Sequence, residues 1–183
     1  RGQLDRDYFP VQFDDMCARI EFLPLAPAMR INDFEITWEY THHPAATVAY
    51  KFARDGRTLS YVSDNEFLFG YLGAPHDVHH GAEILTPYQP LIDFLAGSDL
   101  LIAEAQYTNE EYRTKIGWGH SSLSNACSLA ALTRAREWII THHDPLHDDD
   151  FLDHKLNLTK QVLHSLGRPI PAFNGYDGMH QYW

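Results

Sequence analysis

Short apolar runs that end in polar, histidine-rich segments constrain this chain more than any other feature of its sequence. The chain has 183 residues, and 12 of them are histidines. Several histidines close or follow strand-like runs, in Thr41-His42-His43-Pro44, Gly119-His120-Ser121-Ser122 and Thr141-His142-His143-Asp144. Imidazole is the commonest side-chain ligand for metals, and a rigid sheet can aim several rings at one point. The pattern therefore favours an α/β fold that carries a metal site.

The periodicity of the chain predicts strands first, and then alternating helices and strands. Strands are expected at residues 19–23, 35–40, 47–53, 58–63, 99–103 and 137–141. Helices are expected at 90–96, from Ser121 or Ser122 to about 135, and at 151–166. Asp55-Gly56 is a hairpin signal, whereas residues 67–90 are rich in Gly, Pro and His and predict an irregular excursion. Since neither a repeat nor a linker interrupts this order, residues 1–183 are interpreted as one domain.

The second expected helix should be amphipathic. Its buried stripe is expected to consist of Leu123, Ala126, Cys127, Ala130 and Ala131. Cys127 lies among small apolar residues, which favours a buried core thiol over a ligand or nucleophile. With only one other cysteine, Cys17, the chain has no disulfide framework, and this favours a cytoplasmic protein.

Composition narrows the classes of partner. The formal charge of −11 disfavours broad binding to nucleic acid, which needs a basic surface. A small phosphorylated substrate stays compatible with this charge, because bound metals reverse its sign locally. No apolar run approaches the roughly 20 residues that span a bilayer, so no membrane partner is expected.

Three residues at separate strand ends form the candidate metal site. An Asp after a strand, such as Asp64, is most often a turn former. His43 and His142, however, each close a strand of their own, and the three side chains together fit a zinc-type site.

The order of these segments resembles the metallo-β-lactamase fold, in its branch near tRNase Z and related phosphodiesterases. The resemblance rests on segments spread over most of the chain: Tyr8-Phe9-Pro10-Val11, His43-Pro44, Tyr61-Val62-Ser63-Asp64-Asn65-Glu66, Asp99–Ala105, Gly119-His120-Ser121-Ser122 and Ile139–Pro145. It implies an α/β fold that forms the C-terminal two-thirds of an αββα sandwich.

The resemblance also implies a role for each candidate. His43 would complete one metal site, Asp64 would bridge two metals, and His142 would complete the second site. Their neighbours His42 and His143 are the competing assignments. The implied cofactor is Zn²⁺, two ions in a complete site, with Mn²⁺ or Fe as alternatives.

His120 is expected to act on substrate rather than to bind metal. It directly precedes a helix N-terminus, where backbone amides and the helix dipole favour an anion. In tRNase Z-like enzymes, the matching His contacts a phosphoryl oxygen or gives a proton to the leaving group. Glu104 matches an acidic position of the family, whereas Ala103 stands where relatives often carry His.

The strongest signature of the family, His-x-His-x-Asp-His, does not occur in these residues. In relatives it lies upstream of the Tyr-Phe-Pro-Val segment. The chain is therefore expected to be part of a longer protein, whose N-terminal part is its first partner. The residues present offer one unshared ligand per metal plus a bridge, so this chain alone should bind metal poorly.

The expected activity is metal-dependent hydrolysis of a small phosphodiester or a similar ester. Bacterial tRNase Z carries a long arm between the positions that match His43 and Asp64, and a tight hairpin fills that interval here. Two alternatives stay open: a non-catalytic domain that keeps the fold for binding or regulation, and a di-iron redox protein. Related enzymes are often dimers, so a homodimer is also open.

Overall fold

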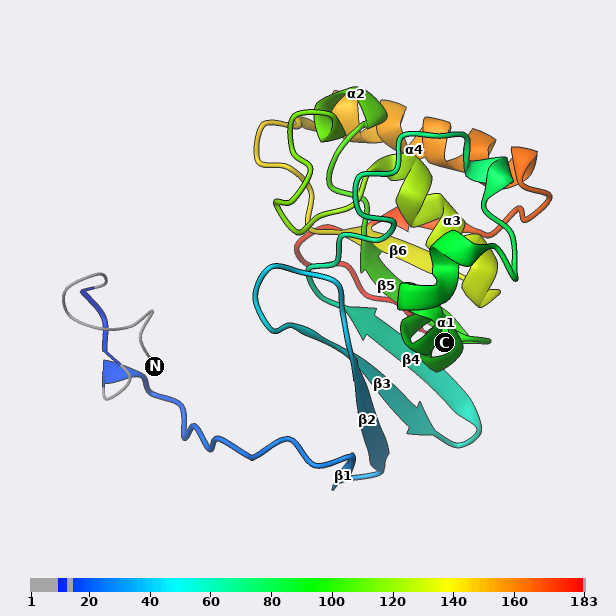
Figure 1. Ribbon diagram of the computed structural model, residues 1–183. Coiled ribbons are helices and arrows are strands. Elements are labelled where there is room, and N and C mark those ends of the chain that lie inside the picture. Colours follow the sequence, from blue (N-terminus) through cyan, green and yellow to red (C-terminus); the bar gives the residue numbers. More distant parts are fainter. Residues whose placement is uncertain (1–9, 13–14, 183) are drawn as a thin grey trace.

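A computed structural model describes residues 10–12 and 15–182, and its framework is one sheet (Figure 1). Seven strands follow one another across the sheet in the order of the sequence. They are β1 (Ala28–Ile31), β2 (Phe34–Tyr40), β3 (Val48–Arg54), β4 (Arg57–Val62), β5 (Leu100–Glu104), β6 (Trp138–Thr141) and β7 (Ala172–Asn174). Of the Tyr8–Val11 segment named above, Tyr8 and Phe9 lie outside the described residues.

The first four strands form an antiparallel meander. The turn between β3 and β4 consists of Asp55 and Gly56, with φ angles of +51° and +76°. Positive φ at both central residues is typical of a type I′ turn, whose twist matches that of the flanking strands. The predicted tight hairpin is therefore confirmed.

The last four strands are parallel, so each connection must cross over the sheet. The crossovers contain α1 (Gln89–Leu95), α3 (Leu123–Thr133) and α4 (Asp149–Ser165). Right-handed crossovers that advance steadily across a sheet place all their helices on one face, and Figure 1 shows this arrangement. The expected excursion contains two short 3-10 helices, Pro75–Asp77 and Glu83–Tyr88, and α2 (Asn109–Tyr112) was not predicted.

Of the five residues predicted to form the buried stripe of helix α3, four are buried (Leu123, Ala126, Cys127 and Ala130), but the helix is buried almost all round and not along one stripe. Its buried residues include polar Ser124, Asn125, Ser128 and Thr133, whereas Ala131 is only partly buried. The reason is tertiary: α3 contacts α1, α4 and β5, which leaves it no broad solvent face. Cys127 is fully buried as expected, and this burial raises the pKa of its thiol.

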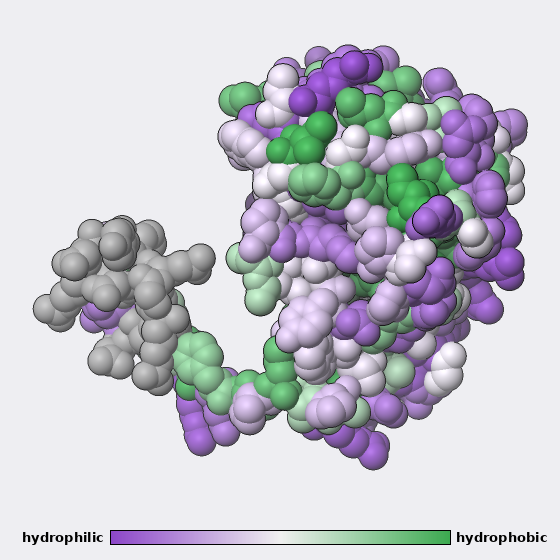
Figure 2. Space-filling model, viewed as in Figure 1, coloured by the Kyte–Doolittle hydropathy of each residue, from purple (hydrophilic) through white to green (hydrophobic). Residues whose placement is uncertain are grey.

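The N-terminal strand was predicted at the wrong place. Residues 19–23 run away from the sheet as an extended segment (Figure 1), and Figure 2 shows its apolar side chains outside the body of the molecule. The first strand is Ala28–Ile31, which pairs with β2 through a turn at Asn32. Alternating apolar residues give a segment one apolar face. To become a strand, the segment must also lie close enough to another strand to pair with it.

The face of the sheet opposite the helices carries apolar side chains. Leu59, Leu100, Ile102 and Ile139 line a hollow of about 520 Å³ there, and residues from Gly175 to Gln181 border it. One sheet with helices on one face is half of the expected αββα sandwich. In the part of the chain that the structure describes, no helix is long and apolar enough to cross a membrane.

Candidate metal centre

The residues at the carboxyl ends of four strands lie at the same edge of the sheet. Strands β2 and β4 are both antiparallel to β3, and β4, β5 and β6 are parallel to one another. All four therefore end at one edge, as the carboxyl ends of parallel strands do. His43, Asp64 and His142 follow β2, β4 and β6, and Glu104 ends β5.

Asp64 lies between the two candidate histidines. Its Oδ2 atom lies 3.8 Å from His43 Nε2, and its Oδ1 atom lies 3.6 Å from His142 Nε2. Each carboxylate oxygen thus faces a different imidazole. The structure brings together the three residues singled out in the sequence as metal ligands.

The structure also separates each candidate histidine from its neighbour. The ring of His42 packs on Tyr88, with ring centroids 4.3 Å apart, and burial lowers the pKa of His42. Both ring nitrogens of His143 are buried, and burial lowers its pKa as well. His142 has φ of +55°, a conformation that costs a non-glycine residue free energy and that turns the chain at this point. His43 and His142 are therefore the members of each pair that reach Asp64.

Hydrogen bonds tie the first two strand-end loops together. The backbone N–H of His42 donates to Asn65 Oδ1 at 3.0 Å, and the Glu66 N–H donates to the His42 carbonyl at 2.6 Å. The Thr41 hydroxyl donates to the Asp64 carbonyl at 2.8 Å. Loops held at both ends in this way can place His43 and Asp64 with little freedom.

His120 lies in the same cluster. Its ring centroid is 5.8 Å from that of His43 and 4.8 Å from that of His142. Its Nδ1 atom lies 3.0 Å from Glu104 Oε1, so Nε2 is the ring nitrogen that can contact another partner. Burial favours neutral imidazole, but the hydrogen bond and charge of Glu104 outweigh it and raise the pKa of His120.

Glu104 positions two parts of the site at once. Its side chain is almost fully buried and accepts hydrogen bonds from the backbone N–H groups of Asn65, at 2.7 Å, and Ser121, at 3.1 Å. It therefore joins the Asp64 loop to the His120 loop. The family resemblance marked Glu104 only as a matching acidic position, and the structure shows that its side chain contacts His120.

Glu66 was missed in the sequence. This buried carboxylate accepts hydrogen bonds from the backbone N–H groups of Gly117 and Gly119 and from the Tyr112 hydroxyl, at 2.7–3.1 Å. It thereby holds the loop that leads into His120. A buried acidic residue two positions after Asp64 was the available signal, but its partners are about 50 residues away in the chain.

Gly119 leaves room for the His43 ring. A Cβ atom on Gly119 would lie 2.1 Å from His43 Cδ2 and 2.8 Å from Pro44 Cδ, and its φ of +92° also favours glycine. No larger residue fits beside His43 without moving it. The Gly-Trp-Gly segment before His120 hinted at close backbone approach, but not at which side chain it would meet.

A buried polar network braces the site from the helix side. Lys155 of α4 donates to the Gln106 carbonyl at 3.0 Å and lies 3.3 Å from His147 Nδ1, while His147 Nε2 lies 2.9 Å from Glu111 Oε1. Burial lowers the pKa of Lys155 to about 8. Because Gln106 follows β5 and His147 follows β6, the network ties the loop after β5 to the loop that begins at His142.

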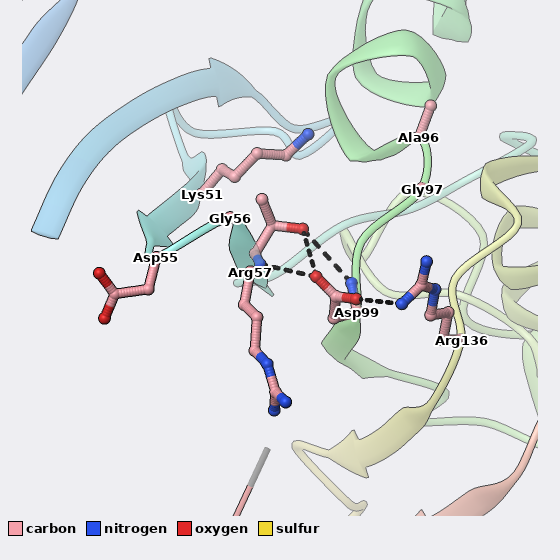
Figure 3. A pocket seen from close by; sticks show the side chains of 9 residues that line it. Lys51, Asp55, Gly56, Arg57, Ala96, Gly97, Asp99 and Arg136 are labelled. Atoms are coloured by element: carbon pink, nitrogen blue, oxygen red, sulfur yellow. Dashed lines mark hydrogen bonds and ion pairs between the residues drawn. The ribbon is translucent and has the colours of Figure 1, made fainter.

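A second hollow, of about 700 Å³, lies at the opposite end of the sheet (Figure 3). Within its charged lining, Arg136 Nη1 lies 2.8 Å from Asp99 Oδ1, and Asp99 Oδ2 accepts a hydrogen bond from the Thr58 N–H. The hollow also contains Gly97, which has φ of +70° and open space where a Cβ would lie.

The strand-end residues fit a divalent metal centre. Two ligand atoms bound to one tetrahedral zinc at about 2.0–2.2 Å lie roughly 3.3–3.6 Å apart. The His–Asp separations of 3.6 and 3.8 Å are close to this spacing. The backbone of Ala45 contacts His43 Nδ1 through its N–H, which donates at 3.1 Å, and through its carbonyl oxygen at 3.3 Å. Nε2 is therefore the ring nitrogen that faces Asp64.

A second combination of residues at this edge also places possible ligand atoms close together. His43, Asp64 and His120 each offer a ligand atom within 4.8 Å of the others. The same edge therefore admits two ligand sets, one that includes His142 and one that includes His120.

The overall architecture is that of the metallo-β-lactamase fold. The chain is similar to the metallo-β-lactamase fold protein YhfI from Bacillus subtilis, with a TM-score of 0.62 and 19% identity over 86% of this chain. It is also similar to a diphosphatase from the PhnP family (TM-score 0.57, 17% identity, 93% of this chain). Zn²⁺-bound PqqB from Methylobacterium extorquens gives a TM-score of 0.56 at 15% identity, over 91% of this chain. The chain covers 54%, 52% and 55% of these three proteins.

Sequence comparison gives a shorter match. Ribonuclease Z from Brevibacillus brevis is 30% identical over 64 residues, which is 35% of this chain and 20% of the relative. No family model matches the chain. The fold predicted from the sequence is confirmed, and the chain spans about half the length of the solved structures that share it.

Proposed function

We propose that this chain is the larger part of a metal-dependent hydrolase that cleaves a small phosphodiester or a similar ester. The observation that carries this proposal is the position of Asp64, whose two carboxylate oxygens each face a different imidazole. This is the arrangement that a carboxylate bridging two ions requires. The likeness to a diphosphatase and to Ribonuclease Z supports phosphoester chemistry.

In this proposal, His43 and Asp64 hold one divalent ion, and Asp64 and His142 hold the other. Zinc is the simplest choice, because imidazole and carboxylate suit it and a solved protein with this fold binds Zn²⁺. When bound, a pair of such ions supplies a water nucleophile at neutral pH and polarises the scissile group.

In this proposal, His120 donates a proton to the leaving group. Glu104 accepts the hydrogen bond from Nδ1, so Nε2 is the atom that donates to the leaving oxygen. The buried carboxylate keeps the ring orientation fixed and favours the protonated form. His120 lies two residues before the N-cap of α3, Ser122, where the positive end of the helix dipole also favours a phosphoryl oxygen.

A small substrate suits this chain better than a folded RNA. The interval between His43 and Asp64 is filled by β3, a two-residue turn and β4, which leaves no projecting arm there. The formal charge of −11 opposes the approach of a polyanion.

The remaining ligands would come from sequence beyond this chain. A zinc site normally takes three or four protein ligands, and the cluster supplies two histidines and one shared carboxylate. The chain covers 52–55% of the solved structures named above. An upstream segment with the His-x-His-x-Asp-His signature would complete both ions.

The test uses the complete protein that contains this chain. It should hydrolyse bis(4-nitrophenyl) phosphate, lose this activity to a chelator and regain it with Zn²⁺. Asp64→Ala should abolish both activity and stoichiometric metal. Wild-type activity in Asp64→Ala would overturn the bridging role, and an intact protein without metal or activity would favour a binding domain. Iron in place of zinc in the purified protein would favour a di-iron redox centre.

A further inference from the structure

A pocket of about 410 Å³ adjoins the metal cluster, and the two share His43. Its lining residues are Thr41, His42, His43, Pro44, Glu66, Phe69, Tyr88 and Gly117. Pockets of roughly 300–1,000 Å³ accommodate small organic ligands. A group bound here would lie beside whatever is held at Asp64.

The lining of this pocket includes the rings of Phe69 and Tyr88 and contains no lysine or arginine. The carboxylate of Glu66 is already engaged by N–H groups of Gly117 and Gly119. The hollow in Figure 3 differs, because lysine and arginine side chains line it. A second phosphate therefore finds little in the pocket beside His43, whereas an uncharged ring finds aromatic faces.

Phe69 is held at the mouth of the pocket in an exposed position. Its side chain is 64% exposed, although the preceding Leu68 is fully buried. Leu68 has φ of +58°, a strained conformation for this residue type. The backbone turns at Leu68, so that Leu68 packs in the core while the ring of Phe69 stands at the pocket.

Side chains from three other elements keep this segment in place. The Tyr88 hydroxyl accepts from the Phe69 N–H at 2.7 Å, and the Tyr112 hydroxyl accepts from the Gly70 N–H at 2.9 Å. The side-chain amide of Asn125 donates to the Leu68 carbonyl at 3.3 Å. The backbone beneath Phe69 is therefore fixed, and an aromatic platform on a fixed backbone binds with little loss of entropy.

We propose that this pocket binds an uncharged, planar aromatic ring of the substrate, which stacks on Phe69 while the ester lies at the metal cluster. The proposal rests on the proposed hydrolase function and names the class of substrate. Aromatic rings gain from offset or edge-to-face contact with Phe and Tyr beyond the area they bury. An ester with an aryl or heteroaryl group would thus be preferred over its alkyl counterpart.

Two phosphonates that differ only in the ring give a direct test. Calorimetry would compare phenylphosphonate with methylphosphonate on the complete, zinc-loaded protein. The aromatic compound should bind roughly 3–10-fold more tightly, the range expected for one aromatic contact. Phe69→Ala should remove this preference, and Phe69→Tyr should restore it. Because Phe69 is exposed, neither substitution should disturb the fold, and thermal unfolding would verify this.

Trp118→Ala is the matched control. Trp118 is also an exposed aromatic residue, at 59%, but it packs under Lys115 and does not line the pocket. It should leave the phenyl preference intact. Equal binding of the two phosphonates to the wild-type protein would overturn this inference alone, as would a preference that survives Phe69→Ala or disappears in Trp118→Ala. Failure of both compounds to bind would overturn the hydrolase proposal and this inference with it.

Discussion

The two ends of the sheet differ in how their polar groups are satisfied. At the hairpin end, Asp99 is paired with Arg136 and bonded to Thr58, and Gly97 faces open space. At the other end, Asp64 pairs with the imidazoles of His43 and His142 and with no lysine or arginine of the described residues, and Gly119 has no room for a Cβ. The carboxylate at the hairpin end is thus matched by an arginine, whereas Asp64 faces two imidazoles, as a ligand of the proposed metals would.

This difference distinguishes the hairpin-end hollow, a surface pocket, from the strand-end cluster, the candidate metal site. The hairpin-end hollow is the larger of the two pockets compared above, at about 700 Å³ against 410 Å³. Positive φ in non-glycine residues occurs at both ends, at Asp55 beside the hairpin-end hollow and at Leu68 and His142 near the strand-end cluster. The buried carboxylates Glu66 and Glu104, in contrast, lie at the strand-end cluster and favour it as the site, although its pocket is smaller.

The largest difference is expected between Asp64→Asn and Asp99→Asn. In the complete protein, Asp64→Asn should lower turnover by at least roughly 10³-fold, since the metals supply several kcal/mol of transition-state stabilisation. Metal analysis of the same samples should show the loss. Asp99→Asn weakens its pair with Arg136 and should leave both metal content and turnover unchanged. Equal effects of the two substitutions would remove the distinction between the two ends.

His120→Ala is expected to have the next largest effect. Turnover should fall by roughly 10²–10⁴-fold, the range for a lost general acid, while metal content stays at the wild-type level. Arg136→Ala is the control at the other end, where an exposed ion pair contributes at most about 1 kcal/mol. If His120→Ala keeps its fold but loses stoichiometric metal, His120 is a ligand and the set His43, Asp64 and His120 is the correct one.

Gly119→Ala and Gly97→Ala form a matched pair for the packing of the site. Both residues have positive φ, so each alanine should cost about 1–3 kcal/mol of stability. Only at Gly119 does the new Cβ meet His43, so this variant should also lose roughly 10–100-fold in zinc affinity. Zinc titration against a competing chelator measures the difference. Similar zinc affinities in the two variants would show that His43 can move without consequence.

The last prediction concerns the pH dependence of stability. Burial lowers the pKa of Lys155 to about 8 from 10.5, so the unfolded chain binds more protons between these values. Stability should therefore be insensitive to this group below pH 8, and should rise above it by at most about 1.4 kcal/mol per pH unit. Chemical denaturation between pH 7 and about 10 would show the rise.

Lys155→Met should remove this rise, and Lys160→Met, at an exposed position of the same helix, should leave it in place. A rise that persists in Lys155→Met would assign it to other groups.

The sequence predicted those features of the structure that depend on residues close together in the chain. The Asp55-Gly56 turn, the strands around it and the polar residues that close β2, β4 and β6 all follow from local patterns. The roles of Glu66 and Gly119 could not be predicted, because their partners are remote in the chain: Gly119 meets His43, and Glu66 binds the Gly117–Gly119 backbone. The strand predicted at 19–23 failed for the same reason, since pairing is decided by a partner that alternation does not reveal.

The central claim is that Asp64 bridges two divalent ions at the shared strand edge. Anomalous scattering at the zinc edge, from crystals of the complete protein grown with Zn²⁺, tests it most directly. The account predicts two peaks, one on each side of the Asp64 carboxylate, with His43 bound to one ion and His142 to the other. A single ion held by His43, Asp64 and His120, or no ion at this edge, would contradict it.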